Sequence, residues 1–250
     1  GFTEWTNVGK AKPLFRNHYQ PLVPADLGYY DLRLPEVRQQ QASLAKEAGV
    51  TAFCYYHYWF GRGKQLLEMP LKEVVKTQSP DFPFCICWAN HTWYKKMWSA
   101  EHSMLDMQAI MPQEYPGPED WDAHFYALLN TFKDSRYYRI DNRLVFVIYH
   151  IADIPDAKDF MNRWQELAQQ EGLNGFYFLS YIDDIADLHN PIHTLCEKKI
   201  VCCKSNISSI GGSPIIRKLY RFAKIVLSRT LHIPLGVYNY NRIRSKLVDK

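Results

Sequence analysis

Two stretches of the chain pass from apolar residues to aromatic and polar residues within the length of one strand. Residues 51–60 read TAFCYYHYWF, which begins as a buried strand pattern and ends in aromatic rings around His57. Residues 84–93 read FCICWANHTW and repeat this design. A strand that is apolar on both faces is typical of a sheet covered by helices. The pattern therefore predicts two core strands whose last residues open into a pocket.

Helical and strand-like patterns alternate along the rest of the chain. Residues 1–33 hold several prolines and glycines between large aromatic side chains, which predicts a long ordered loop. Apolar residues recur with the helical period in residues 34–48, 66–75, 116–132, 156–171 and 215–231. Apolar runs typical of strands occupy residues 50–59, 82–89, 143–150, 175–182 and, more weakly, 195–203. This order predicts parallel strands joined by right-handed crossovers.

Two architectures fit this order, an open doubly wound sheet and a barrel. No GxGxxG motif or P-loop follows a predicted strand, which argues against a nucleotide-binding sheet. Functional residue types stand at the C-terminal ends of several strands, as in a barrel, namely His57, Asn90, His150 and Asp183. We therefore predict an α/β fold, a TIM-type (β/α)8 barrel. Residues 1–250 would form one partial barrel domain that lacks the first and the C-terminal strands.

The charge of the chain is mild and uneven. The formal net charge of +4 does not demand nucleic acid, and no basic stripe interleaved with aromatics is visible. Residues 205–250 form a basic segment, within which residues 215–229 read as a basic amphipathic helix. This helix is either an outer barrel helix with a solvated face or a contact with anionic lipid at the membrane surface.

The six cysteines favour a reducing compartment. Cys54, Cys85 and Cys87 lie in buried strand patterns, where a thiol behaves as a small apolar group. Their spacing is not a zinc framework, and the chain is too long to need disulfides. We expect a cytoplasmic protein without a bound metal or cofactor. A peripheral position at the inner face of the membrane is a second possibility for its location. No run of residues has the length and apolarity of a membrane span.

Aromatic residues make up 15% of the chain, with 7 Trp and 17 Tyr. A large core alone would explain such a composition. Many of these rings, however, stand beside His, Asn and Gln near predicted strand ends. Sugars offer apolar C–H faces to aromatic rings and hydroxyls to polar side chains, so the distribution favours a carbohydrate ligand.

Four segments carry a family resemblance: GFTEWTNV at residues 1–8, the stretch 18–50, CYYHYWF at 54–60 and PDFPFCICWANHTW at 80–93. They resemble the WbsX-type glycosyltransferase family, which is related to glycoside hydrolase family 99. The resemblance runs from residue 1 to about residue 181. It implies a (β/α)8 barrel with a sugar-binding cleft on its C-terminal face. It also implies a role in bacterial surface polysaccharide assembly, such as lipopolysaccharide O-antigen or capsule.

The chain departs from the family pattern at two places. The family reads WANE-x-W where this chain reads WANHTW, so that His91 occupies a glutamate position. The family also has a strand before GFTEW and a later NEWAEG-like segment that carries its catalytic glutamates, and neither is present in these residues. The resemblance therefore implies a fragment or a truncated member.

Transfer at an anomeric carbon usually employs two carboxyl groups. The candidates are Glu4 and Asp31, with Asp183 as a third. The choice of Glu4 as a catalytic residue rests mostly on the resemblance, and the alternative role of its carboxylate is to cap a turn. The alternative for Asp31 is a capping role ahead of the next helix, and the alternative for Asp183 is a helix cap or a solvated turn.

The predicted substrate-binding residues are aromatic, histidine and amide side chains near strand ends: Trp5, Tyr30, Tyr56, His57, Tyr58, Trp88, Asn90, His91, Trp93 and His150. Alternate residues of a strand point to opposite faces, so Tyr56 and Tyr58 share a side and His57 takes the other. Parity alone does not say which side is the pocket. A core position is the alternative for His57 and for Trp88.

The leading hypothesis is a carbohydrate-active enzyme, formally a glycosyltransferase of surface-polysaccharide biosynthesis. Its partners would be an oligosaccharide or lipid-linked glycan and a sugar nucleotide donor. The runner-up is an endo-acting glycoside hydrolase of the family 99 type. The third hypothesis, of another class, is a glycan-binding remnant without catalysis.

Overall fold

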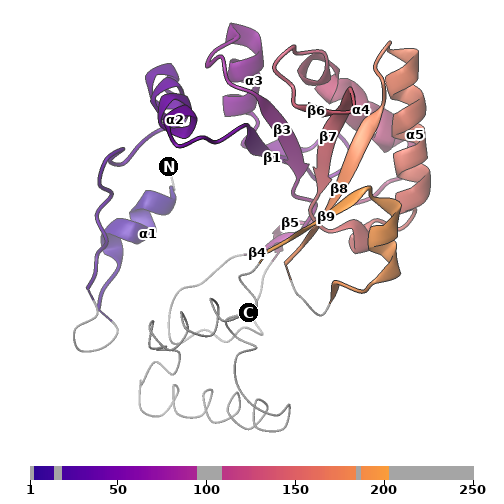
Figure 1. The fold of residues 1–250 in the computed structure, drawn as a ribbon. Coiled ribbons are helices and arrows are strands. Elements are labelled where there is room, and N and C mark those ends of the chain that lie inside the picture. Colours follow the sequence, from indigo (N-terminus) through magenta and orange to yellow (C-terminus); the bar gives the residue numbers. More distant parts are fainter. Residues whose placement is uncertain (1–2, 14–18, 95–108, 184–186, 203–250) are drawn as a thin grey trace, which may run out of the picture. The chain divides into compact units, whose positions relative to one another are not determined.

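The computed structural model describes residues 3–13, 19–94, 109–183 and 187–202 (Figure 1). The chain separates into two compact units. The larger unit spans Leu32–Lys95 and Gln108–Lys204, and the smaller unit takes in Gly1–Asp31 with Lys96–Met107 and Ser205–Lys250. All strands described below belong to the larger unit. The expectation of one domain over residues 1–250 stays a prediction, and the basic segment 205–250 lies outside the described residues.

Parallel strands form the centre of the larger unit. They are β1 (Phe53–Trp59), β3 (Phe84–Trp88), β7 (Arg143–Ile148), β8 (Phe176–Ile182) and β9 (Lys198–Val201). They pair in the order β1-β3-β7-β8-β9, which is also their order in the sequence. Two short strands pair antiparallel with this sheet, β2 (Gln65–Leu66) with β1 and β6 (Arg139–Ile140) with β7. A separate antiparallel pair joins β4 (Trp93–Tyr94) and β5 (Ala109–Met111).

The strand order bears on the two predicted architectures. A doubly wound sheet reverses its direction of winding at a switch point, whereas these parallel strands follow one another without reversal. The described fold is therefore mixed α/β with a parallel sheet wound in one direction. Closure into a barrel stays a prediction.

Helices connect successive strands. Those between strands are α3 (Met69–Thr77), α4 (Pro118–Phe132) and α5 (Ala157–Gln170), with short 3-10 helices η1 (Ile151–Asp153) and η3 (Pro191–Leu195), whereas α2 (Pro35–Glu47) precedes β1. Pro35, Pro70 and Pro118 each lie in the first turn of a helix, where the missing N–H leaves no hydrogen bond unmade. In Figure 1, α5 runs alongside β8.

The core lies between the sheet and its helices. Right-handed crossovers between strands that follow one another in order place every connecting helix on the same face of the sheet. Ring contacts show which strand residues point to that face: Phe146 lies 4.9 Å from Trp164 of α5, and Phe176 lies 5.0 Å from Phe132 of α4. All four side chains are fully buried, so this layer is the hydrophobic core.

A buried ion pair fixes the N-terminal edge of the sheet. The carboxylate of Asp134 and the guanidinium of Arg136 lie 2.6 Å apart with side chains 0% and 7% exposed. Arg136 also donates to the carbonyls of Val74 and Pro80, which ties the end of α3 to the start of β3. Hydrogen bonds from Arg136 hold the pKa of Asp134 below its usual value against the effect of desolvation.

The sequence patterns located most elements. The helix expected at 34–48 is α2, and the weak strand expected at 195–203 is β9. The loop expected over residues 1–33 is corrected at one place, because helix α1 (Glu4–Lys10) forms there. No proline interrupts these seven residues, and Glu4 in the first turn and Lys10 in the last both complement the helix dipole. The helix expected at 215–231 lies outside the described residues.

Candidate functional site

Tyrosine, tryptophan, histidine and aspartate side chains lie where the parallel strands end. We call them the aromatic edge, and they are Tyr56, Tyr58, His91, Trp93, Tyr149, His150, Tyr181 and Asp183. Tyr56 and Tyr58 belong to the end of β1, His91 and Trp93 follow β3, Tyr149 and His150 follow β7, and Tyr181 and Asp183 come from the end of β8. All these residues lie in the larger unit.

The register of the strands explains why these rings meet. Tyr56 pairs with Cys87, which in turn pairs with Val147, and Val147 pairs with Leu179. In parallel strands, paired residues point to the same face, and so do residues two positions further along. Tyr58, Tyr149 and Tyr181 therefore lie on the face that Tyr56 also occupies. This is the face opposite the helices.

The rings of the aromatic edge form a continuous series. The Tyr149 ring stacks on Tyr181 at 4.6 Å and meets Tyr56 edge-on at 6.1 Å. Tyr56 stacks on Tyr58 at 6.4 Å, and Tyr58 meets Trp93 at 4.9 Å. Tyr56 is 52% exposed, so the series is accessible to a ligand at least at this ring.

Two imidazoles and two carboxylates border the tyrosines. The His91 ring lies 5.5 Å from Tyr149 and 5.9 Å from His150. Nδ1 of His150 lies 3.2 Å from a carboxylate oxygen of Asp153, and its Nε2 lies 3.9 Å from Asp183. Desolvation and the nearby charge of Asp183 both raise the pKa of Tyr149, so its hydroxyl stays protonated and can donate a hydrogen bond.

Asn90, which follows β3, fixes the backbone of His150. Its side chain is fully buried, its Nδ2 donates to the His150 carbonyl at 2.7 Å, and its Oδ1 accepts from the His150 N–H at 2.8 Å. Nδ2 also donates to the hydroxyl of Tyr115 at 2.9 Å. The amide thus clamps the backbone of His150 on both sides. Asn90 is a positioning residue here, and its amide is occupied by protein partners.

His57 and Trp88 point to the other face of the sheet. His57 is 4% exposed, and its Nε2 lies 2.9 Å from Nε2 of His124 in α4. Trp88 is also buried, and its Nε1 donates to the carbonyl of Trp59 at 3.0 Å. The register pairs His57 with Trp88, so both side chains lie under the helices. These two residues take the core position that was the alternative, and we do not include them among the ligand contacts.

Four predicted site residues belong to the smaller unit: Glu4, Trp5, Tyr30 and Asp31. Within that unit, Trp5 Nε1 donates to the Tyr30 carbonyl at 2.9 Å, and the two rings meet edge-on at 5.1 Å. This contact joins α1 to the residues that lead toward α2. A catalytic role for Glu4 or Asp31 stays a prediction.

Tyr149 and Tyr181 were not among the sequence-predicted site residues. Tyr149 directly precedes the predicted His150, and both tyrosines lie in strand patterns that read simply as core. The feature of the sequence that could have identified them is the alternation of side chains between the two faces of a strand. Once Tyr56 is assigned to the ligand face, the strand register assigns Tyr149 and Tyr181 to the same face.

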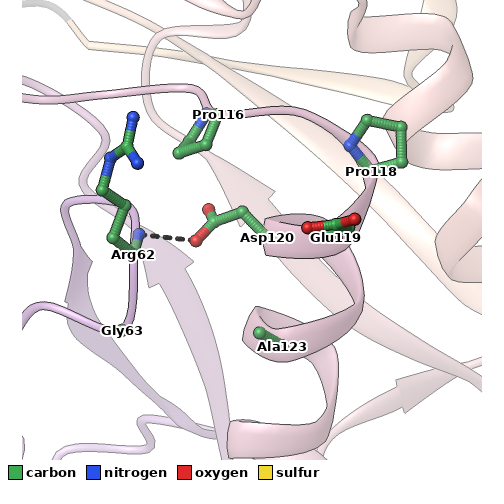
Figure 2. Close-up of a pocket in the computed structure, with 7 residues that line it drawn as sticks. All are labelled: Arg62, Gly63, Pro116, Pro118, Glu119, Asp120 and Ala123. Carbon is green, nitrogen blue, oxygen red and sulfur yellow. Dashed lines mark hydrogen bonds between the residues drawn. The ribbon is translucent and has the colours of Figure 1, made fainter.

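A pocket of about 640 Å³ lies next to β1, between the β1–β2 turn and the start of α4 (Figure 2). Its lining includes Arg62, Glu119 and Asp120. Asp120 accepts from the Arg62 backbone N–H at 2.6 Å, as Figure 2 shows, and from Trp59 Nε1 at 2.9 Å. These bonds fasten the turn after β1 to the N-terminus of α4, which is a structural role for Asp120.

Neither a metal centre nor a membrane span is found in the part of the chain that the structure describes. No group of His, Cys, Asp or Glu side chains there has the arrangement of a metal site. None of the described helices is both long and apolar enough to cross a bilayer.

The family model of "Glycosyltransferase WbsX" matches residues 1–250. The chain belongs to the WbsX glycosyltransferase family. Two curated relatives, each called "Uncharacterized protein WxcX", come from Xanthomonas campestris pv. campestris strains B100 and ATCC 33913. Each is 39% identical over 183 residues, which is 73% of this chain and 25% of the relative. The chain therefore spans about a quarter of the length of these two relatives.

Solved structures resemble the fold of this WbsX family member. A "Glycoside hydrolase-like protein" shares 12% sequence identity at a TM-score of 0.52, covering 85% of this chain and 64% of that one. The GH99 endo-alpha-mannosidase from Bacteroides thetaiotaomicron shares 16% identity at a TM-score of 0.40, covering 71% and 46%. At such identities, the first likeness speaks for the fold alone.

Proposed function

We propose that the chain is part of a glycosyltransferase that assembles bacterial surface polysaccharide, such as lipopolysaccharide O-antigen or capsule. The observation that carries the proposal is the aromatic edge, considered together with membership of the WbsX family. Its substrates would be a sugar nucleotide and an oligosaccharide or lipid-linked glycan. The enzyme would work in the cytoplasm, and residues 215–229 would touch the inner face of the membrane.

The chemistry of the edge suits a sugar. The ring of Tyr56, which is 52% exposed, offers a face to the C–H groups of a pyranose, beside the stacked pair of Tyr149 and Tyr181. Phenol hydroxyls, imidazoles and the Asp183 carboxylate supply donors and acceptors for its hydroxyls. In the proposed fold, a (β/α)8 barrel completed by further strands, this edge is the C-terminal face, where barrel enzymes bind their substrates.

Direct assay of transfer tests the proposal. The complete protein is incubated with tritium-labelled GDP-mannose, UDP-glucose, UDP-galactose or dTDP-rhamnose and with a polyprenyl-diphosphate oligosaccharide acceptor. We expect label to pass to the lipid-linked fraction. Release of sugar from the acceptor without transfer would instead support an endo-acting glycoside hydrolase. Saturable oligosaccharide binding in calorimetry without turnover would indicate a glycan-binding remnant, and the absence of any binding would overturn all three.

A substitution at the aromatic edge tests the location of the site. Replacing Tyr56 by Ala removes an exposed ring face that would cover roughly 50 Å² of sugar, worth about 1.4 kcal/mol, or about a tenfold loss of affinity. Tyr126 on α4 is 48% exposed, so Tyr126→Ala is the matched control and should bind as wild type does. Calorimetry with the same oligosaccharide measures both. Equal affinities of the two variants would place the site elsewhere.

A further inference from the structure

Resting on the proposed glycosyl transfer, we propose that His150 is the group that takes the proton from the attacking hydroxyl of the acceptor sugar. The imidazole of His150 lies between two carboxylates at the end of β7, with Asp153 at Nδ1 and Asp183 near Nε2. The side chain is 34% exposed and so is within reach of a ligand.

The contact with Asp153 decides which nitrogen is basic. Nδ1 of His150 lies 3.2 Å from Oδ2 of Asp153. A carboxylate only accepts hydrogen bonds, so Nδ1 carries the proton in this contact. In the neutral imidazole, the lone pair then belongs to Nε2. Asp153 holds this tautomer and stabilises the imidazolium that forms when Nε2 accepts a proton, as the aspartate does in other His–Asp pairs.

The position of Asp183 shows what Nε2 faces. The distance of 3.9 Å from Nε2 to Oδ2 of Asp183 is longer than a hydrogen bond. Both atoms are acceptors in this tautomer, so a ligand with two neighbouring donors would satisfy both. Adjacent hydroxyls of a sugar are such a pair, with one donating to Nε2 and the other to Asp183.

The transfer step balances with these groups. The acceptor oxygen forms a bond to the anomeric carbon of the donor, and the bond from that carbon to the diphosphate oxygen breaks. The diphosphate leaves with the electron pair of the broken bond. The proton of the acceptor hydroxyl passes to Nε2 of His150 and later to solvent. No atom changes its oxidation state in this step.

Asn90 makes the position of His150 rigid. Its amide binds both the N–H and the carbonyl of His150, at 2.8 and 2.7 Å, and it is itself fully buried. A general base must stay within hydrogen-bond distance of the proton that it removes. Asn90 and Asp153 are therefore positioning residues, which act through His150 and not on the sugar itself.

The test compares two acceptors in His150→Gln. One is the natural hydroxyl acceptor of the transfer assay, and the other carries a fluorine next to the attacking hydroxyl, which makes that hydroxyl more acidic. Loss of a general base typically costs about 10²–10⁴-fold in rate. We expect kcat with the ordinary acceptor to fall at least about 100-fold and the loss to shrink at least about tenfold with the fluorinated acceptor. The KM for the sugar nucleotide should be unchanged.

Controls separate the possible causes of a loss. His189 is an exposed histidine outside the aromatic edge, and His189→Gln should transfer as wild type does. Asp153→Asn should show the same dependence on acceptor acidity as His150→Gln, in a weaker form. Retained transfer by His150→Gln, or an equal loss with both acceptors, would overturn the inference. Absence of transfer by the wild-type protein would overturn the proposed function itself, irrespective of any variant.

Discussion

The buried pair His57 and His124 should make this protein sensitive to mild acid. Both rings lie in the core, 4% and 1% exposed, and their Nε2 atoms are 2.9 Å apart. One ring must donate and the other must accept, so at most one of the two can be charged while this bond is made. Burial lowers the pKa of His57 to about 3, with a smaller contribution from the charge of Lys72. Burial also lowers the pKa of His124 well below its ordinary value, and the neighbouring His57 adds to this effect.

The direction of the effect follows from proton binding. In the unfolded chain, both histidines titrate near their ordinary pKa of 6.5. Between that pH and about 3, the unfolded state therefore binds more protons than the folded state, and stability falls as the pH falls. At pH 5, each histidine costs about 2 kcal/mol, because one pH unit corresponds to about 1.36 kcal/mol. For the pair, the free energy of unfolding should fall by about 4 kcal/mol from pH 7 to pH 5.

A double variant isolates the contribution of the two histidines to the pH dependence of stability. In His57→Phe/His124→Phe, two apolar rings of similar size replace the imidazoles, beside Trp59, whose ring stacks on His124 at 4.7 Å. Urea unfolding followed by tryptophan fluorescence at pH 7 and pH 5 gives the free energies. The double variant should lose about 4 kcal/mol less than wild type over this range, and His189→Gln should behave as wild type. A difference under about 1 kcal/mol would refute the reasoning. Proton NMR adds a second readout, because the His57 and His124 ring signals should not titrate down to pH 5.

Three further predictions concern stability and the position of His150. Replacing Arg136 by Ala leaves the Asp134 carboxylate buried and unpaired, so the free energy of unfolding should fall by about 3–5 kcal/mol in urea titration, and a loss under 1 kcal/mol would contradict this. Gly61 has φ +88°, and an added Cβ would lie 2.9 Å from a backbone oxygen, whereas Gly63 has φ +73° with open space. Gly61→Ala should therefore lower the melting temperature more than Gly63→Ala, and equal shifts would show that the contact relaxes freely. Asn90→Ala removes the three hydrogen bonds of a fully buried amide, and we expect a loss of about 2–4 kcal/mol of stability together with slower transfer. Unchanged transfer in Asn90→Ala would show that the clamp does not serve the site.

Much of the fold could be predicted from local patterns. The apolar runs and helical periods located the strands β1, β3, β7 and β8 and the helices between them, because burial on both faces and the 3.6-residue period leave a direct mark in sequence. The strand order needed pairing information that no single stretch contains. The short helix α1 was missed, since the prolines around it pointed to a loop. The predicted site residues His91 and His150 do lie where β3 and β7 end, and their role there stays a prediction.

The sequence by itself determined the alternation of strands and helices, and it also determined the family. Both depend on residues that stand close together along the chain. It also determined that Tyr56 and Tyr58 share one side of their strand and that His57 takes the other. Only the tertiary structure decided which side the helices cover. That depends on the crossovers and on ring contacts between distant segments, such as His57 with His124, 67 residues apart. For the same reason, only the structure showed that Asn90 serves His150, and that Tyr149 and Tyr181 complete the aromatic edge.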